Sequence, residues 1–336
     1  MLLLFASGLL EFIFPTLDFF INQFLPALFF RHSRLRGNDD ASHDIYERNL
    51  FLIMFPFQTL CQAVFIEGVG LHSGATVKLG LLPRQECGLV FKRTDLPGAP
   101  LVSASARHIG STLHATRLQD GEVEIATPEH LLAALWSLGV THCTIELDGP
   151  EIPILDGSAR LWCELITSAG LKALPGARPE YSLREPIAFF KNDGAVIGLP
   201  HASLRVTCDV EFGVPYLETQ AAVCEVTAQS FSKELAPART FTLESWLEPL
   251  RAQGLIRGGS TDNALVLGKH EASSPLRFEN ELARHKALDA LGDIALLFGE
   301  DGGVLHAHII AIRAGHEMHR LWMREVVGRQ ALLKQS

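Results

Sequence analysis

The feature that most constrains how this chain can fold is a proline- and glycine-rich run near its middle. Three prolines and one glycine fall within residues 171–186, where neither a helical nor a strand period continues. Both residue types favour turns and interrupt regular structure, so we interpret this run as a linker. The 336 residues also exceed the length of one ordinary domain, roughly 100 to 200 residues. We therefore predict two domains, domain I at 58–175 and domain II at 181–325.

Strand-like and helix-like segments occur on both sides of this run. Alternating apolar and polar side chains predict strands, whereas apolar residues at a helical period predict helices. The strands are expected at 77–81, 144–147, 204–212 and 306–313, and the helices at 243–253 and 278–298. The glycine-rich segment 68–74 precedes a strand-like run and not a helix, which predicts a hairpin instead of a dinucleotide-binding turn. The expected fold class is α+β.

The composition is that of a folded protein and gives no support to a nucleic-acid partner. Hydrophobic residues make up 47% and charged residues 20%, unlike the polar, highly charged chains that stay disordered. The formal net charge is -9 and no block of lysine and arginine occurs, so we expect no nucleic-acid partner. The six cysteines form no C-x-x-C pair, which argues against a zinc ribbon or a disulfide framework and indicates a reducing, cytoplasmic setting.

Residues 1–57 form a leader of unusual composition. Its first part is strongly apolar, but two acidic residues interrupt it, so no uncharged run reaches the roughly 18 to 20 residues of a membrane span. We expect the folded protein to begin near Gln58, with translation from Met54 and a leader that is disordered or mis-assigned. The alternative is a membrane tether, which the basic residues within 31–36 would suit.

The first motif that carries chemistry is TPEH at residues 127–130. Thr127 can cap a helix and Pro128 suits the first helical turn, so we expect Glu129 and His130 at a helix start. Leucines at a helical spacing behind them would anchor this helix while its polar first turn faces a cleft. The simpler alternative is that Glu129 only stabilises the positive end of the helix dipole.

A second motif places three ionisable residues on one stripe of a predicted helix. His285, Asp289 and Asp293 are spaced four residues apart, and Leu288 and Leu291 lie on a neighbouring apolar stripe. A histidine and an aspartate one turn apart can both reach one metal ion. The alternative is an exposed pair on a solvated helix face, since such spacings also occur without a ligand.

Two further segments are candidates for the site. His316 follows a glycine at the end of a predicted strand, where turns often carry catalytic groups. His319 completes H-E-M-H and not the H-E-x-x-H pattern of zinc proteases, so we expect it at the surface. Thr240 and Phe241 place a hydroxyl beside an aromatic ring, which suits a sugar, although a helix cap with a core aromatic is the alternative.

Ordered motifs cover nearly all of the chain after the leader. They are GVGLHSG (68–74), RTD (93–95), TPEHLLAAL (127–135), PEIPILDGSA (150–159), ARTF (238–241), GLIRGGS (254–260), RFENELARHKALDALGD (277–293) and AGH (314–316). Together, and in this order, they resemble the UDP-3-O-acyl-N-acetylglucosamine deacetylases. The resemblance runs from about Gln58 to about Trp322 and gives residues 1–57 no counterpart.

The resemblance implies a zinc amidase that removes acetate from a UDP-linked, 3-O-acylated glucosamine, the committed step of lipid A synthesis in Gram-negative bacteria. It implies a two-domain sandwich in which each domain is a mixed sheet packed with helices, with the active site between the domains. Carried over by motif, the ligands of one catalytic zinc ion are His130, His285 and Asp289. Iron is the alternative ion in the cell.

The resemblance also assigns roles to the residues around the metal. Glu129 would be the general base and His316 the general acid, with Asp293 orienting His316. A base must lie close to the proton that it takes, and Glu129 adjoins the ligand His130. Thr240 would contact the reacting carbonyl.

Substrate contacts follow from the same resemblance. Phe241 would contact the sugar and Lys286 the polar head of the substrate, whose negative charge needs a counter-charge in an acidic protein. Residues 243–266 resemble an insert that lines the acyl-chain passage. Phe212 aligns with a uracil-stacking position.

The expected partner is therefore a small UDP-linked acylated sugar, and we expect a cytoplasmic monomer with a peripheral contact to the inner membrane. A zinc amidase or esterase of another substrate is one alternative, since a metal and a base specify hydrolysis but not the acyl group. A sugar-nucleotide- or lipid-binding protein without activity is the other. The presence of Glu129 and His316 argues against it, because binding needs neither a base nor an acid.

Overall fold

The computed structural model describes residues 55–335. The predictions for the leader, including the membrane tether and a start at Met54, concern residues that lie outside this range. Among the described residues, no helix is both long enough and apolar enough to cross a membrane.

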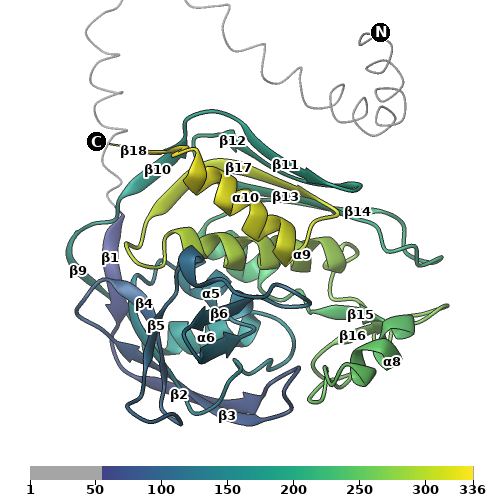
Figure 1. The fold of residues 1–336 in the computed structure, drawn as a ribbon. Helices are drawn as coiled ribbons and strands as arrows, with labels where there is room; N and C mark the ends of the chain where they lie inside the picture. Colours follow the sequence, from purple (N-terminus) through teal and green to yellow (C-terminus); the bar gives the residue numbers. More distant parts are fainter. Residues whose placement is uncertain (1–54, 336) are drawn as a thin grey trace, which may run out of the picture. The chain divides into compact units, whose positions relative to one another are not determined.

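The first half of the described chain builds a seven-stranded mixed sheet (Figure 1). Its strand order is β2-β3-β8-β1-β9, and β4 joins β8 and pairs in turn with β5. The strands are β1 (Pro56–Leu60), β2 (Val64–Val69), β3 (Thr76–Pro83), β4 (Gly88–Arg93), β5 (Leu101–Ser103), β8 (His142–Leu147) and β9 (Leu171–Ala177). Val77, Leu79 and Leu81 of β3 are buried while Lys78 is exposed, as the alternation in the sequence predicted. The predicted hairpin is β2 and β3, which pair antiparallel around the glycine-rich segment.

The second half builds another seven-stranded mixed sheet, ordered β11-β12-β17-β10-β18, with β13 on β17 and β14 on β13. The strands are β10 (Glu180–Leu183), β11 (Ile187–Lys191), β12 (Gly194–Pro200), β13 (Leu204–Val210), β14 (Gln220–Glu225), β17 (Val304–Ile312) and β18 (Leu332–Lys334). Along β17, Leu305, Ala307 and Ile309 are buried and alternate with half-buried residues. This strict alternation shows that one face of the second sheet packs on the core.

The predicted linker was wrong in its extent. Residues 171–177 form β9, which pairs antiparallel with β1, and residues 180–183 form β10, which pairs with β17. Proline occurs in β9 because this strand lies at the edge of its sheet, where a missing backbone donor faces no partner strand. The break between the two sheets is only Arg178 and Pro179.

Helices lie between the two sheets and bring the halves of the chain together (Figure 1). They include α5 (Glu129–Ser137), α6 (Arg160–Ala169), α9 (Glu281–Ile294) and α10 (His316–Gly328). Leucines of α5 and α9 belong to one continuous hydrophobic cluster that also includes side chains of both sheets. The fold class, α+β with two mixed sheets packed with helices, is confirmed, whereas the boundaries 58–175 and 181–325 stay a prediction.

A close crossing between α5 and α9 positions the site. A Cβ atom on Gly292 of α9 would lie 2.0 Å from the carbonyl oxygen of Glu129 at the start of α5, so only glycine permits this approach. The first turn of α5 therefore lies against the polar stripe of α9.

The remaining elements are short. They are the strands β6 (Arg117–Asp120), β7 (Val123–Ala126), β15 (Phe241–Leu243) and β16 (Leu265–Leu267), the helices α7 (Ala228–Ser230) and α8 (Glu244–Ala252), the 3-10 turns Ala106–His108 and Ala295–Leu297, and the π turn Phe231–Leu235. β15, β16 and α8 project from the second half beside α9 (Figure 1). Residues 243–266, which fall within this part of the chain, are called the insert below.

Candidate active site

The first turn of α5 is buried and differs in one detail from the prediction. Glu129 and His130 are 3% and 5% exposed, and α5 begins at Glu129 as expected. Thr127 does not cap the helix, because its φ of 57° turns it away and its hydroxyl donates to Glu151 Oε1 at 3.0 Å. Pro128 occupies the capping position without a side-chain hydrogen bond. The turn is held by the buried carboxylate of Glu151, which the sequence had not indicated.

The polar stripe of α9 is buried and not solvated. His285, Asp289 and Asp293 are 1%, 2% and 1% exposed, so the alternative of an exposed pair was wrong. Nδ1 of His285 lies 3.1 Å from the carbonyl oxygen of Ala238, which accepts the proton of that nitrogen. The ring is thereby held with Nε2 directed toward Asp289, as is usual for histidines that ligate a metal.

His130, His285 and Asp289 bring three ligand atoms to one point. Oδ1 of Asp289 lies 3.4 Å from Nε2 of His130 and 3.3 Å from Nε2 of His285. This buried oxygen has no hydrogen-bond partner among the residues that the structure describes, and a buried polar atom left without a partner is costly. Two imidazoles and one carboxylate within 4.8 Å of one another fit a divalent metal ion with an open position.

The charges of this group suit metal binding. Burial lowers the pKa of His285 to about 3, with His130 and Lys286 adding to the effect, so the imidazole is neutral. Burial alone would raise the pKa of Asp289, but the positive charge of the neighbouring Lys286 opposes it, and the pKa is held well below its ordinary value. Neutral imidazoles and an ionised carboxylate are the forms that bind a metal.

Glu129 and His316 lie next to this group. Nε2 of His316 is 3.8 Å from Oε1 of Glu129 and 3.8 Å from Oδ2 of Asp289. Burial raises the pKa of Glu129 to about 7, although His316 and His130 oppose the shift. Burial would lower the pKa of His316, but the carboxylates of Asp293 and Glu129 raise it to about 9. The pair thus combines a carboxylate that titrates near neutrality with a charged imidazole.

Asp293 lies behind His316 and accepts hydrogen bonds on both oxygens. Its Oδ2 lies 2.8 Å from Nδ1 of His316 and 2.7 Å from Nδ1 of His319, and its Oδ1 lies 2.5 Å from the hydroxyl of Thr116. The prediction that His319 lies at the surface was wrong, because His319 is fully buried. His316 begins α10 instead of lying on a free turn, so the helical period places His319 beside it one turn later.

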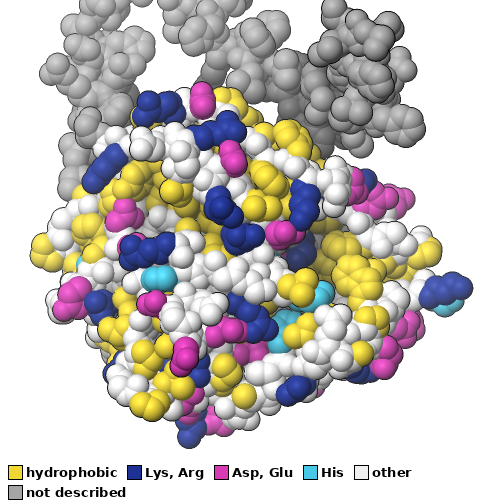
Figure 2. Space-filling model, viewed as in Figure 1, with side chains coloured by type: hydrophobic (Ala, Val, Ile, Leu, Met, Phe, Trp, Pro, Cys, Tyr) yellow, Lys and Arg dark blue, Asp and Glu magenta, His cyan; other side chains and the backbone are white. Residues whose placement is uncertain are grey.

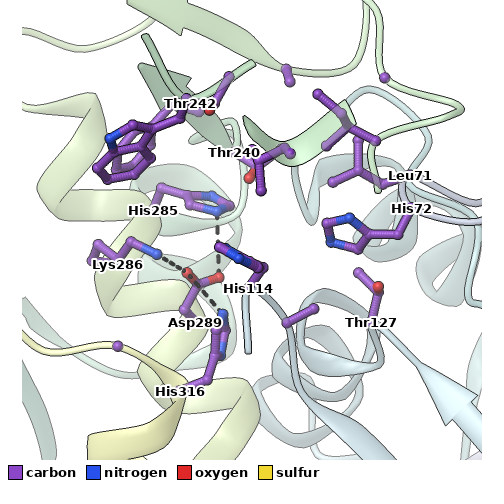
Figure 3. A pocket seen from close by; sticks show the side chains of 18 of the residues that line it. Leu71, His72, His114, Thr127, Thr240, Thr242, His285, Lys286, Asp289 and His316 are labelled. Carbon is purple, nitrogen blue, oxygen red and sulfur yellow. Dashed lines mark hydrogen bonds and ion pairs between the residues drawn. The ribbon is translucent and has the colours of Figure 1, made fainter. Parts of the chain in front are cut away.

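These groups open into a cavity of about 770 Å³. Figure 2 shows histidine side chains in the hollow, beside hydrophobic ones. In Figure 3, Lys286, His285, Asp289 and His316 lie together, and His72 faces them from the other side. Two of these side chains are joined by an ion pair, in which Nζ of Lys286 donates to Oδ2 of Asp289 at 2.8 Å.

The four predicted substrate-binding or carbonyl-binding residues all line this cavity. Thr240, Phe241, Phe212 and Lys286 belong to its wall. The rings of Phe212 and Phe241 meet edge to face with centroids 4.8 Å apart, and Nζ of Lys286 lies 5.5 Å from the centre of the Phe241 ring. The structure therefore joins two aromatic rings and a cation beside the metal-binding group.

Another part of the cavity wall is mostly apolar. It is formed largely by the insert and by the loop after β2, through Leu71, Ile154, Trp246, Leu247, Leu250, Ile256 and Val266. We call the wall at α9 the polar end of the cavity and the wall at α8 its apolar end, although Arg251 of α8 also lines the latter.

Sequence reasoning missed several residues of the wall. His72 follows Leu71 in the predicted hairpin and could have been found from the GVGLHSG motif, but His114 belongs to no pattern that marks it. The same holds for Thr116, which lies behind the wall and contacts Asp293. Nδ1 of the buried His72 has no hydrogen-bond partner in the described part of the chain. A lone threonine or histidine in a loop becomes visible only when the fold places it beside the other groups.

Comparisons with known proteins agree with this chemistry. A family model described as UDP-3-O-acyl N-acetylglycosamine deacetylase matches residues 57–328. A UDP-3-O-acyl-N-acetylglucosamine deacetylase of Nostoc sp. is 41% identical over 268 residues, which is 78% of this chain and 94% of the relative. Deacetylases of the same name from Bdellovibrio bacteriovorus and Myxococcus xanthus are each 36% identical, over 81% and 80% of this chain and 90% and 86% of their own.

Proposed function

The chain belongs to the family of UDP-3-O-acyl N-acetylglycosamine deacetylases, and we propose that it hydrolyses the acetamide of UDP-3-O-acyl-N-acetylglucosamine to the free amine and acetate, in lipid A biosynthesis. The observation that carries this proposal is the meeting of three buried metal-binding side chains with Glu129 and His316 at the polar end of one cavity. Amide hydrolysis needs these parts, since water must be activated and the departing amine must receive a proton.

We infer that the metal is one zinc ion held by His130, His285 and Asp289. The two-nitrogen, one-oxygen donor set and the orphaned Oδ1 of Asp289 support this assignment. A zinc ion bound there would act as a Lewis acid and lower the pKa of a bound water from about 15.7 to about 7.

The proton transfers then fall to two side chains. Glu129, whose pKa is raised to about 7, takes the proton of the attacking water on its carboxylate. His316, whose pKa is raised to about 9, is protonated at neutral pH and gives its Nε2 proton to the departing amine. Asp293 accepts from Nδ1 of His316 and so directs Nε2 toward Glu129 and Asp289. We assign the Thr240 hydroxyl to the oxygen of the reacting carbonyl, where a donor stabilises developing negative charge.

The two ends of the cavity match the two ends of the substrate. We propose that Lys286 meets the negative charge of the nucleotide-sugar, that Phe241 contacts the sugar and that Phe212 stacks on the uracil. The apolar end formed by the insert at 243–266 then takes the acyl chain. The acyl chain would contact the aliphatic and aromatic side chains of this end. Removal of its apolar surface from water on binding would contribute to the affinity.

The remaining predictions extend this proposal to the whole protein. We propose a cytoplasmic monomer with domains at 58–175 and 181–325 and a peripheral contact with the inner membrane. The half-exposed Trp246 beside the apolar end of the cavity is consistent with such a contact.

Substrate comparison tests the proposed function. The full chain, loaded with zinc, should release acetate from UDP-3-O-acyl-N-acetylglucosamine and far more slowly from UDP-N-acetylglucosamine, which has no acyl chain to fill the apolar end. Equal rates on both substrates would contradict the assignment of the apolar end. Binding of the acylated substrate without any acetate release would support the binding-protein alternative instead.

A further inference from the structure

A set of buried polar side chains behind His316 has no role in the proton transfers described above. It consists of Thr116 in the loop before β6 and His319 on α10, both of which contact the carboxylate of Asp293. Thr116 is 2% exposed and His319 is fully buried. Neither side chain lines the cavity, so neither can touch the substrate.

We propose that His319 and Thr116 are positioning residues for the deacetylation, and that they hold the Asp293 carboxylate in the one orientation that directs Nε2 of His316 into the site. This inference rests on the proposed function. Asp293 receives a hydrogen bond from a different element on each oxygen, with Thr116 on Oδ1 and the two histidines of α10 on Oδ2.

The geometry explains why two extra contacts are needed. The terminal torsion of an aspartate is soft, so a carboxylate held only by His316 can rotate and let the imidazole turn with it. Thr116 at 2.5 Å and His319 at 2.7 Å fix both oxygens, which removes this rotation. Proton transfer depends steeply on such alignment, since small misplacements of a catalytic group cost about 10²-fold in rate.

The other ring nitrogen of His319 argues against a role in stability alone. Its Nε2 is buried and has no hydrogen-bond partner in the described part of the chain, so the ring carries an uncompensated polar atom. An apolar side chain of similar size would avoid that penalty. Within residues 55–335, the polar contact that the His319 side chain makes is the hydrogen bond from Nδ1 to Asp293, and we assign the histidine to that contact.

Paired substitutions test the inference on the zinc-loaded full chain with UDP-3-O-acyl-N-acetylglucosamine. His319→Leu removes the donor, whereas His319→Asn keeps an N–H near the place of Nδ1. Thr116→Val and Thr116→Ser form a second pair that removes or keeps the hydroxyl with little change in volume. His270→Leu is the matched control, because His270 is exposed and lies outside the cavity.

We expect His319→Leu and Thr116→Val to lower kcat about 10- to 100-fold, the usual effect of removing a side chain that orients a catalytic group. KM, zinc content and the thermal unfolding midpoint should stay near those of the wild type, since no substrate or metal contact is lost. His319→Asn and Thr116→Ser should restore most of the loss, and His270→Leu should behave as the wild type.

Wild-type kcat in both His319→Leu and Thr116→Val would overturn the inference. So would a loss of kcat that follows a loss of zinc or of folded protein, or a loss that the donor-keeping variants do not restore. If the wild type itself releases no acetate, the proposed function is overturned. This outcome differs from failure of the further inference, in which the wild type is active and only the behaviour of the variants departs from expectation.

Discussion

At the scale of residues, Glu129 and His316 are suited to opposite proton transfers. Oε1 of Glu129 and Nε2 of His316 lie 3.8 Å apart. Burial raises the pKa of the carboxyl to about 7, while the carboxylates around His316 outweigh its burial and raise that pKa to about 9. Near neutral pH, Glu129 can therefore accept a proton and His316 can donate one. This division of roles follows from where each side chain is buried and which charges it faces.

Substitution of Glu129 tests its role as the base. Glu129→Gln keeps the size of the side chain but removes its ability to take a proton, so kcat should fall by about 10² or more. Zinc content should be unchanged because Glu129 is outside the three-residue metal-binding group. Both quantities can be measured on the same preparation by acetate release and metal analysis. Near-normal turnover by the glutamine variant would show that another group takes the proton.

His308 on β17, which is not part of the metal-binding group, predicts a pH dependence of stability. Burial lowers its pKa from 6.5 to about 4, and Arg205 adds to the effect. The unfolded chain therefore takes up this proton first, so the contribution of His308 to stability is complete above pH 6.5 and is lost as the pH falls through about 4. We expect the free energy of unfolding of His308→Gln to fall less than that of the wild type between pH 6.5 and about 4. Urea unfolding of both proteins, after removal of metal with a chelator, measures this difference.

The control for His308 is His270→Gln, which removes a histidine at the surface. This variant should keep the wild-type dependence on pH. Parallel profiles for His308→Gln and the wild type would contradict the assignment.

At the scale of elements, the start of α5 and the middle of α9 lie close enough to share one metal-binding group. The helical spacing predicted that His285 and Asp289 share a face, and the TPEH motif predicted a helix start at Glu129. No periodicity indicates that the two helices cross, because the crossing depends on the missing side chain of one residue, Gly292. His319 was expected at the surface for a similar reason, because the H-E-M-H motif does not indicate which elements pack against its helix.

Enlargement of Gly292 tests this crossing. In Gly292→Ala the new Cβ would lie 2.0 Å from the carbonyl oxygen of Glu129, so α5 and α9 must move apart. Overpacking of this kind typically costs about 1 to 3 kcal/mol, and the displacement separates His130 from His285 and Asp289. We expect a lower unfolding midpoint together with weaker zinc binding.

Gly299→Ala offers a comparison for Gly292→Ala. A Cβ there would also meet backbone, at 1.8 Å from the carbonyl oxygen of Ala104, but away from the metal-binding group. It should lower stability while leaving the zinc affinity of the folded protein unchanged. Equal losses of zinc affinity in both variants would contradict the role of the crossing.

At the scale of the whole molecule, one hydrophobic cluster joins side chains of both sheets and the helices between them. The family resemblance implied two mixed sheets packed with helices, whereas local composition predicted a linker where β9 and β10 continue the two sheets to within two residues of each other. Proline in an edge strand looks like a break when the partner strand is unknown, because the pairing partner, β1, lies more than a hundred residues earlier in the chain. Long-range pairing of this kind cannot be inferred from local composition.

Deacetylation by this chain requires above all that His130, His285 and Asp289 hold one metal ion. The decisive measurement is metal content together with acetate release on the same full-chain preparation, before chelation, after chelation and after reloading with zinc. We predict about one zinc ion per chain, loss of activity with the ion, recovery on reloading, and neither ion nor activity in Asp289→Ala. Undiminished acetate release by metal-free protein, or stoichiometric zinc in Asp289→Ala, would contradict it.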